Sequence, residues 1–239
     1  MVNADDPLIA GQPVPEGVNR ITFGLNDADI RASAIESRGI RGQCFTLHIG
    51  DENIAVSLAA FGRHNINNAL AAAAAAHALG IPTGIIGNGL ELFRPYDKRF
   101  NLEKIGRIML IDDSYNANPA SMSAALETLA ELKGNKAAFV ALGDMLELGS
   151  NEAELHRMVG VQAAQVADRL YLHGRLSDHA AEGAISAGMP ATAVIRGLSH
   201  TEIAADILSS ASDGDFVLLK GSRGMKMDRI AEGIRNRIS

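Results

Sequence analysis

Three short polar segments carry most of the side chains in this sequence that could do chemistry. Residues 112–118 read Asp-Asp-Ser-Tyr-Asn-Ala-Asn, residues 143–149 read Gly-Asp-Met-Leu-Glu-Leu-Gly, and residues 220–224 read Lys-Gly-Ser-Arg-Gly. The carboxylates of the first two segments could hold a ribose hydroxyl or a magnesium ion. Lys220 and Arg223 lie beside flexible glycines in the third segment, where they could bind a carboxylate or a phosphate.

Each segment taken alone has an ordinary structural interpretation, because Asp, Asn, Ser and Gly are common in turns and helix caps. That interpretation weakens once the segments are placed along the chain. Each follows an apolar run that is predicted to be a strand, and these runs cover residues 105–111, 137–142 and 216–219. Since ligands of parallel α/β sheets bind outside the carboxyl ends of the strands, we expect the three segments to meet at one sheet edge.

A fourth polar segment, residues 62–68, leads into an alanine-rich helix. Asn68 falls within the first turns of that predicted helix, where asparagine is a poor choice. Asn65 and Asn68 are three residues apart, so they share a helix face and could present their amides to the edge of a base. Asn65 could instead simply cap the helix. His64 has no companion at metal-ligand spacing and is interpreted as a structural hydrogen-bonding residue.

The elements that position the first domain follow from its turn and periodicity signals. Between residues 20 and 59, short apolar runs predict strands, the last two of them joined as a hairpin through residues 50–52. Helices are predicted over residues 65–79 and about 83–93. A linker at residues 95–98 follows, and we place a domain boundary near Arg99.

Beyond that boundary the pattern becomes regular. Five apolar runs alternate with helical patterns, which predicts a parallel, doubly wound α/β sheet. The helix starts are well marked, since Asn118 and Pro119 suit the cap and first position of one helix. Ser199 and Glu202 have the spacing of a capping box for another.

Composition and charge narrow the class of protein further. The chain has 239 residues, 47% of them hydrophobic, and a net charge of -6, which suits one large domain or two ordinary ones. It has no long Lys/Arg run, so we expect neither nucleic acid nor an anionic membrane surface as a partner. Residues 1–7 do not resemble a signal peptide. A single cysteine, Cys44, excludes an internal disulfide, and the expected compartment is the cytoplasm.

Several catalytic motifs are missing from the sequence. It contains no Gly-Lys dipeptide and therefore no phosphate-binding loop of the form G-x-x-x-x-G-K-[ST]. The patterns G-x-G-x-x-G, G-x-S-x-G and H-E-x-x-H are missing as well. The residues alone therefore predict a two-domain α/β protein that binds a small molecule, without a complete catalytic set.

The three polar segments closely resemble the corresponding loops of the Mur ligases, in particular of those that add D-alanyl-D-alanine. Asn-Ala-Asp-Asp-Pro at residues 3–7 and Gly-Arg-His-Asn at residues 62–65 are similar to the later half of the family's central ATPase domain. The resemblance covers nearly the whole chain. It implies that residues 1–98 are the C-terminal part of that central domain, and that residues 99–239 are the Rossmann-like C-terminal ligase domain.

The resemblance also implies an activity, namely an ATP-dependent ligase of peptidoglycan synthesis. In this reaction ATP phosphorylates the carboxylate of UDP-MurNAc-tripeptide, and the amine of D-Ala-D-Ala attacks the acyl phosphate to give an amide, ADP and phosphate. The implied cofactors are ATP and Mg²⁺. The family's phosphate-binding loop, magnesium ligands and carbamylated lysine lie upstream of these residues, so we expect the chain alone to be inactive. The alternatives are a standalone nucleotide-binding module without ligase activity and a different Mur-type amide ligase.

The resemblance assigns nucleotide contacts residue by residue. It implies that Asn65 and Asn68 lie on the adenine side, that Arg99 lies near the ATP phosphates, and that Asp113 contacts the ribose. Asn116 is expected to approach the nucleotide from the same loop as Asp113.

For the face that closes over the incoming dipeptide, the resemblance implies Lys220, Ser222 and Arg223. Asp228 stands where a glutamate is common in the family, which is a mild departure. No residue of the chain is expected to be a metal ligand.

Overall fold

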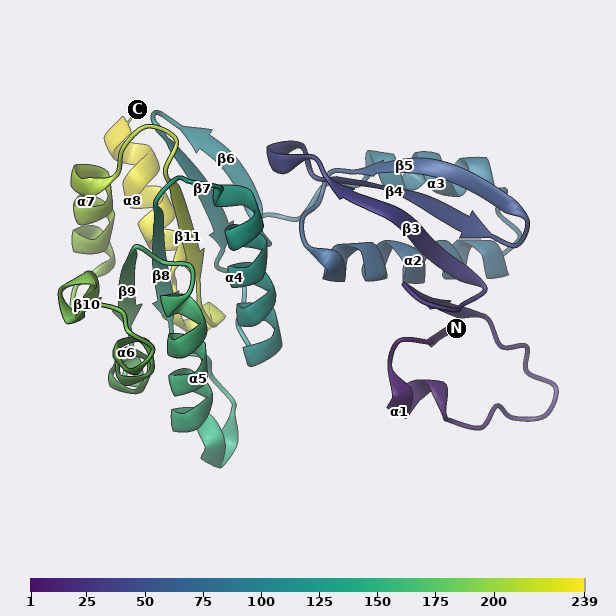
Figure 1. Ribbon diagram of the computed structural model, residues 1–239, viewed down its shortest axis with the longest axis horizontal. Helices are drawn as coiled ribbons and strands as arrows, with labels where there is room; N and C mark the ends of the chain where they lie inside the picture. The colour runs from purple at the N-terminus through teal and green to yellow at the C-terminus, as the bar shows by residue number, and fades with distance from the viewer. Residues whose placement is uncertain (239) are drawn as a thin grey trace. The chain divides into compact units, whose positions relative to one another are not determined.

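The computed structural model describes residues 1–238, which form two compact units (Figure 1). The first unit is Met1–Arg94 and the second is Pro95–Ser239. The division between the units falls slightly before the boundary expected near Arg99, because the residues that follow Arg94 make their contacts within the second unit. Within that unit, the backbone N–H of Tyr115 donates to the carbonyl of Lys98 at 3.0 Å. No helix within residues 1–238 combines the length and the apolar character that crossing a membrane requires.

The first unit contains a five-stranded mixed sheet with the order β1-β2-β3-β4-β5. The first three strands run parallel to one another, and the last two continue as antiparallel neighbours. The expected hairpin is confirmed, with Gly50 at a φ of 56° in its turn. The strands are β1 (Val2–Asn3), β2 (Thr22–Gly24), β3 (Ile30–Ser37), β4 (Gln43–Ile49) and β5 (Glu52–Leu58).

Two helices pack on this sheet, and the core lies between them and the strands. The helix α2 (Arg63–Ala78) packs against β2 and β3, and α3 (Thr83–Leu92) packs against β5. Leu47, Ile66 and Leu70 are fully buried in this core. The alanines of α2 suit this packing because they let the helix approach the sheet closely. A short helix, α1 (Pro7–Ala10), and a 3-10 turn, η1 (Gly39–Arg41), complete the unit.

The second unit contains a six-stranded sheet with the order β10-β9-β8-β11-β7-β6. Every neighbouring pair is parallel except β6 with β7. The expected doubly wound α/β sheet is therefore confirmed. The strands are β6 (Asn101–Ile105), β7 (Ile108–Asp113), β8 (Ala138–Gly143), β9 (Arg169–His173), β10 (Val194–Arg196) and β11 (Phe216–Lys220).

The first apolar run of this unit does not form one strand as expected. Residues 105–111 end β6 and begin β7, because Gly106 takes a φ of 53° in the turn between them. The sequence pattern missed β6, whose side chains are half-buried or exposed and therefore form no apolar run. A second run, from residue 191, starts with the 3-10 turn η3 (Ala191–Ala193) before β10 begins.

Helices cover both faces of this sheet, with α4 and α5 on one side and α7 and α8 on the other (Figure 1). Two helix starts agree with the sequence, since Asn118 caps α4 and Ser199 with Glu202 forms the capping box of α7. The helices are α4 (Pro119–Lys133), α5 (Glu152–Ala164), α6 (Ser177–Ser186), α7 (His200–Ser210) and α8 (Asp228–Ile238); the 3-10 turns are η2 (Gly149–Asn151) and η4 (Arg223–Met225).

Candidate functional site

The three polar loops of the second unit meet at one edge of the sheet. They follow β7, β8 and β11, and β11 lies between the other two strands. Ser222 connects all three loops, because its N–H donates to the Asp144 carbonyl at 3.0 Å and its hydroxyl accepts from Leu146 N at 2.9 Å. The same hydroxyl donates to the Ala117 carbonyl at 3.4 Å. The expectation that the segments gather at the carboxyl ends of the strands is confirmed.

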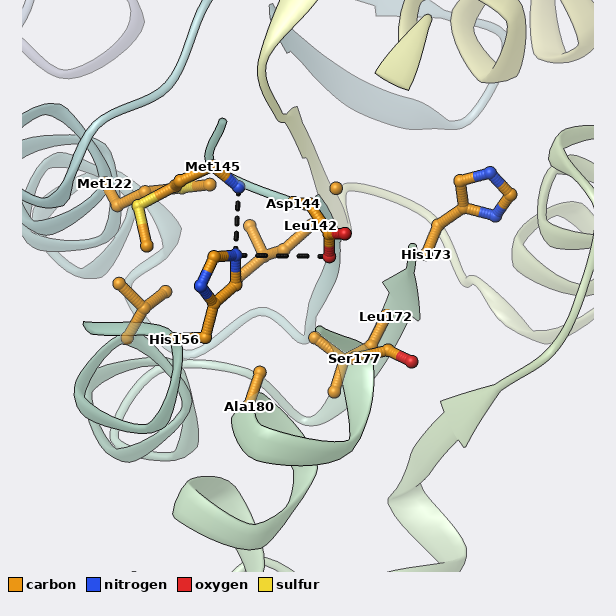
Figure 2. Close-up of a pocket in the computed structure, with 11 residues that line it drawn as sticks. Met122, Leu142, Asp144, Met145, His156, Leu172, His173, Ser177 and Ala180 are labelled. Carbon is orange, nitrogen blue, oxygen red and sulfur yellow. Dashed lines mark hydrogen bonds and ion pairs between the residues drawn. The ribbon is translucent and has the colours of Figure 1, made fainter. Parts of the chain in front are cut away.

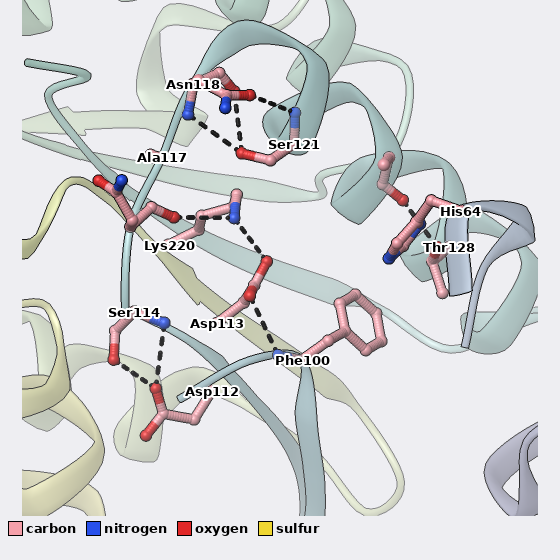
Figure 3. A network of polar contacts seen from close by, with 12 residues as sticks. His64, Phe100, Asp112, Asp113, Ser114, Ala117, Asn118, Ser121, Thr128 and Lys220 are labelled. Carbon is pink, nitrogen blue, oxygen red and sulfur yellow. Dashed lines mark hydrogen bonds and ion pairs between the residues drawn. The ribbon is translucent and has the colours of Figure 1, made fainter. Parts of the chain in front are cut away.

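A buried ion pair joins the first and third loops (Figure 3). Lys220 Nζ lies 2.6 Å from Asp113 Oδ2, and the two side chains are 3% and 15% exposed. Lys220 also donates to the Asn116 carbonyl at 3.1 Å, while Asp113 Oδ1 accepts from Phe100 N at 3.0 Å. Charge-assisted bonds of this kind fix the backbone on both sides of the carboxylate. Asp113 therefore holds the start of the second unit against its first loop.

Lys220, Ser222 and Asp113, which the resemblance assigns to ligand contacts, use their polar atoms in hydrogen bonds within the second unit. Lys220 and Ser222 are buried, and their polar atoms are directed at neighbouring loops. In this structure they hold the loops of the site in place. Their direct contact with a dipeptide stays a prediction. Asp113 is partly buried and both of its oxygens accept hydrogen bonds within the unit, so its contact with a ribose hydroxyl stays a prediction.

The two exposed arginines of the site share one aromatic ring. The Arg99 guanidinium carbon lies 4.5 Å from the centroid of the Tyr115 ring, and that of Arg223 lies 5.9 Å from the same centroid. Both distances fit cation–π contacts. Sequence reasoning assigned no role to Tyr115, although it is the one aromatic residue in an otherwise small and polar loop.

Lys98 and Asp228 form a second ion pair beside this cluster, with Lys98 Nζ 2.6 Å from Asp228 Oδ2. The hydrogen bond from Lys98 lowers the pKa of the Asp228 carboxyl, and the same bond raises the pKa of Lys98. Asp228 opens α8, so the pair ties the segment before β6 to the last helix. The aspartate at a position where the family often has glutamate thus has a partner of its own.

Behind the second loop, Asp144 and His156 line a small cavity (Figure 2). Asp144 accepts the Leu176 N–H with both oxygens, each at 3.2 Å. Met145 N donates to His156 Nε2 at 2.9 Å, so this nitrogen is an acceptor and the ring proton sits on Nδ1, which donates to the Glu152 carbonyl. The imidazole is therefore neutral, and its 3.9 Å approach to Asp144 is not an ion pair. These two residues support the loop structurally.

The loops at this edge also hold backbone strain. Lys98, Phe100, Glu147 and Lys226 have φ values of 62°, 49°, 63° and 52°, in the left-handed region that residues with a Cβ seldom adopt. Strained backbone of this kind gathers at functional sites, where surrounding contacts hold it in place. It is an independent indication that this edge is the site.

Asn65 and Asn68 belong to the first unit and share a face of α2 as expected. Asn68 Nδ2 lies 3.3 Å from Asn65 Oδ1, and Asn65 Nδ2 donates to the Phe61 carbonyl at 2.8 Å. Asn65 does not cap the helix, because α2 begins at Arg63 and the cap position is Gly62. Asn68 is exposed, which leaves an amide free to meet a ligand.

A metal centre is not evident in the part of the chain that the structure describes. No group of three or more His, Cys, Asp and Glu side chains able to hold a metal ion occurs within residues 1–238. We assign no metal ligand among these residues.

The geometry first defines a class of protein: a doubly wound α/β domain with charged loops at the carboxyl ends of its strands, preceded by a smaller α/β unit. In sheets of this class, ligands bind at that end of the strands. Comparison with family models is more specific. The Mur ligase middle domain matches residues 1–76, and the Mur ligase, glutamate ligase domain matches residues 98–223. The chain belongs to the Mur ligase family.

Two curated relatives carry the same name. The UDP-N-acetylmuramoyl-tripeptide--D-alanyl-D-alanine ligase of Bacillus subtilis (strain 168) is 35% identical over 175 residues, which are 72% of this chain and 38% of the relative. The ligase of the same name from Escherichia coli (strain K12) is 36% identical over 200 residues, 81% of this chain and 42% of the relative. The chain thus spans less than half the length of these two relatives.

Solved structures show the same relationship. A crystal structure of MurF from Acinetobacter baumannii matches with a TM-score of 0.79 and 30% identity, covering 90% of this chain and 46% of that one. The MurF ligase from Thermotoga maritima in complex with ADP matches with a TM-score of 0.83, covering 98% of this chain and 52% of that one. At 22% identity, this second likeness shows the fold alone.

Proposed function

We propose that this chain forms the later part of the ATPase domain and the C-terminal domain of an ATP-dependent ligase that joins D-Ala-D-Ala to UDP-MurNAc-tripeptide. The observation that carries the proposal is the meeting of the three loops at one sheet edge, in a chain whose relatives bear the name of that ligase. We assign the residues up to Arg94 to the ATPase domain and those from Pro95 onward to the C-terminal domain.

The chemistry explains why such an enzyme needs these residue types. A free carboxylate is a poor electrophile, so the tripeptide is first phosphorylated by ATP; the D-Ala-D-Ala amine then attacks the acyl phosphate, and phosphate leaves as the amide forms. Phosphoryl transfer is catalysed mainly by positioning and by cationic groups that offset the charge of the phosphate oxygens. Arg99, an exposed arginine at the sheet edge, suits the neutralisation of phosphate charge.

On the nucleotide side, Asn65 and Asn68 are assigned to adenine, Asp113 to the ribose and Arg99 to the phosphates. Asn116 is exposed in the same loop as Asp113, and its carbonyl accepts a hydrogen bond from Lys220. A carboxylate contact to a ribose hydroxyl and an amide contact to a base edge are both directional bonds, so they fix the nucleotide's orientation.

On the dipeptide side, Arg223 is exposed and can contact the substrate, while Lys220 and Ser222 hold the loops that frame it. ATP and Mg²⁺ are the proposed cofactors. When bound with the phosphates, the magnesium ion would supply positive charge there. We expect the 239 residues alone neither to hydrolyse ATP nor to form the amide, since no phosphate-binding loop occurs in their sequence.

The first experiment measures ATP binding by calorimetry with wild-type chain, Asp113→Asn and Asn68→Ala. Losing one directional bond to the ligand should weaken ATP about 3- to 30-fold in each variant. The matched control is Asn53→Ala, which changes an exposed asparagine on β5. Equal ATP affinity in all four proteins would contradict the nucleotide assignment.

A second experiment tests ligation and separates the alternatives. The chain is joined to the part of the E. coli ligase that precedes the matched region, and phosphate release is measured with UDP-MurNAc-tripeptide, ATP and one amine at a time. Release only with D-Ala-D-Ala supports the proposal. Release with a different amino acid would indicate another Mur-type amide ligase. ATP binding without release from any amine would favour a nucleotide-binding module.

A further inference from the structure

One ring in the second unit is contacted by two cations from different loops. Tyr115 lies in the loop after β7, Arg99 precedes β6, and Arg223 begins η4 after β11. Their guanidinium carbons lie 4.5 Å and 5.9 Å from the Tyr115 ring centroid. Tyr115 is 40% exposed, so this cluster is at the surface of the site and open to a ligand.

The backbones that carry the three side chains are fixed independently of the ring. Tyr115 N donates to the Lys98 carbonyl at 3.0 Å, next to Arg99. Ser222, next to Arg223, is held by the Asp144 carbonyl and by Leu146 N. The ring contacts therefore decide where the two guanidinium groups point, and not where the loops lie.

Neither arginine is neutralised by a carboxylate. Within residues 1–238, the ion pairs involve other arginines, lysines and histidines, and neither Arg99 nor Arg223 forms a side-chain hydrogen bond there. Two like charges drawn to one ring repel each other, and the attraction of the ring for each cation offsets part of this repulsion. An anion bound between them would remove the rest.

We propose that Tyr115 is a positioning residue that holds Arg99 and Arg223 together as one site for a di- or triphosphate. A single carboxylate is matched by one guanidinium, whereas a phosphate chain carries enough charge and oxygens for two. This inference rests on the proposed function, because it takes the nucleotide's phosphate chain as the ligand. The inference also changes the role proposed for Arg223, which would then bind the phosphate chain together with Arg99 instead of the dipeptide.

Inorganic pyrophosphate is the probe, because it has neither base nor ribose and reports on the phosphate site alone. Its dissociation constant is measured by NMR from the arginine Nε–Hε signals in wild-type chain, Tyr115→Leu and Tyr115→Phe. Loss of the ring should weaken pyrophosphate roughly three- to tenfold, and phenylalanine should restore it, because the ring face attracts the cations. The matched control is Tyr96→Leu, which removes the ring of a 78% exposed tyrosine in the same unit and should leave the pyrophosphate constant unchanged.

A double-mutant cycle gives the readout that a purely structural role would not move. In an Arg223→Gln background, where the Arg99 signal still reports binding, Tyr115→Leu should weaken pyrophosphate less than it does in the wild-type chain. A melting temperature lowered by Tyr115→Leu with an unchanged pyrophosphate constant would overturn the proposal, as would an equal loss in the Arg223→Gln background or no binding to wild type at millimolar pyrophosphate. ATP affinity that is insensitive to Asp113 and Asn68, with the pyrophosphate result intact, would instead refute the nucleotide assignment and leave the anion site standing.

Discussion

Lys220 and Asp113 are direct cross-strand neighbours in the sheet, and their side chains form an ion pair of 2.6 Å at its carboxyl edge. The pair lies where β11 and β7 end, so the register of two parallel strands decides that the charges meet. Through Oδ1, the same carboxylate holds the N–H of Phe100 at 3.0 Å. One buried pair thus joins the last strand, the first loop and the entry segment of the second unit.

Replacing Lys220 by methionine should destabilise the second unit, because it leaves the Asp113 charge without its partner. We expect the free energy of unfolding to fall by about 2–4 kcal/mol, somewhat below the full cost of a broken buried pair because Asp113 is partly exposed. Urea denaturation followed by circular dichroism measures this. The control Lys104→Met changes an exposed lysine and should stay within about 0.5 kcal/mol. Equal losses in both variants would rule out the importance of the pair.

The second unit should fold by itself when it includes its entry segment. A protein of residues 95–239 is expected to unfold cooperatively in urea, since it has its own core and sheet. A version starting at residue 101 loses the buried Phe100 and the Lys98–Asp228 ion pair, so its unfolding midpoint should be lower. Identical midpoints would show that residues 95–100 are only a linker.

His200 should make the second unit less stable in mild acid. Burial lowers the pKa of His200, and the nearby His173 and Arg229 lower it further, against the opposing effects of its hydrogen bond to the Met225 carbonyl and of Asp228. Because the pKa is lower in the folded state, the unfolded chain takes up the proton more readily. The stabilisation is therefore present above about pH 6.5 and is lost as the pH falls below it.

His200→Asn keeps a hydrogen-bond donor but cannot titrate. Urea denaturation at about pH 7.5 and about pH 5.5 should show a smaller loss of stability in this variant than in the wild-type chain. The comparison between variants removes the contribution of carboxylates that also titrate in acid. If both proteins lose the same free energy of unfolding, His200 is not the source.

Two glycines allow α5 and α6 to pack closely. A Cβ at Gly160 would lie 1.9 Å from the Ala180 carbonyl oxygen, and one at Gly183 would lie 2.0 Å from that of Arg157. Gly160→Ala should therefore force the helices apart and lower the free energy of unfolding by roughly 1–3 kcal/mol. Gly89→Ala is the matched control, because its Cβ would meet nothing within 4 Å and should stabilise α3 by about 0.5–1 kcal/mol. Thermal unfolding in which both variants change in the same direction would contradict this.

Sequence alone was sufficient for features that depend on neighbours along the chain. Asn118 and Ser199 cap helices because a cap bonds to a backbone group only a few residues away. The hairpin through Gly50 and the alternation of strands and helices are local in the same sense. The polar segments after β7, β8 and β11 could also be recognised, since their residue types stand out from the apolar strands before them and resemble those of the Mur ligases.

Tertiary structure alone decided how those segments combine. Lys220 and Asp113 are about a hundred residues apart in sequence, and only the placement of β11 between β7 and β8 makes them partners. The same placement turns Lys220 inward and brings Arg99 and Arg223 to one ring. Residue type predicts that a lysine can bind an anion, but the strand order and register determine which anion it reaches. The sequence pattern could therefore locate the site, whereas the contacts that each residue makes within it depend on the fold.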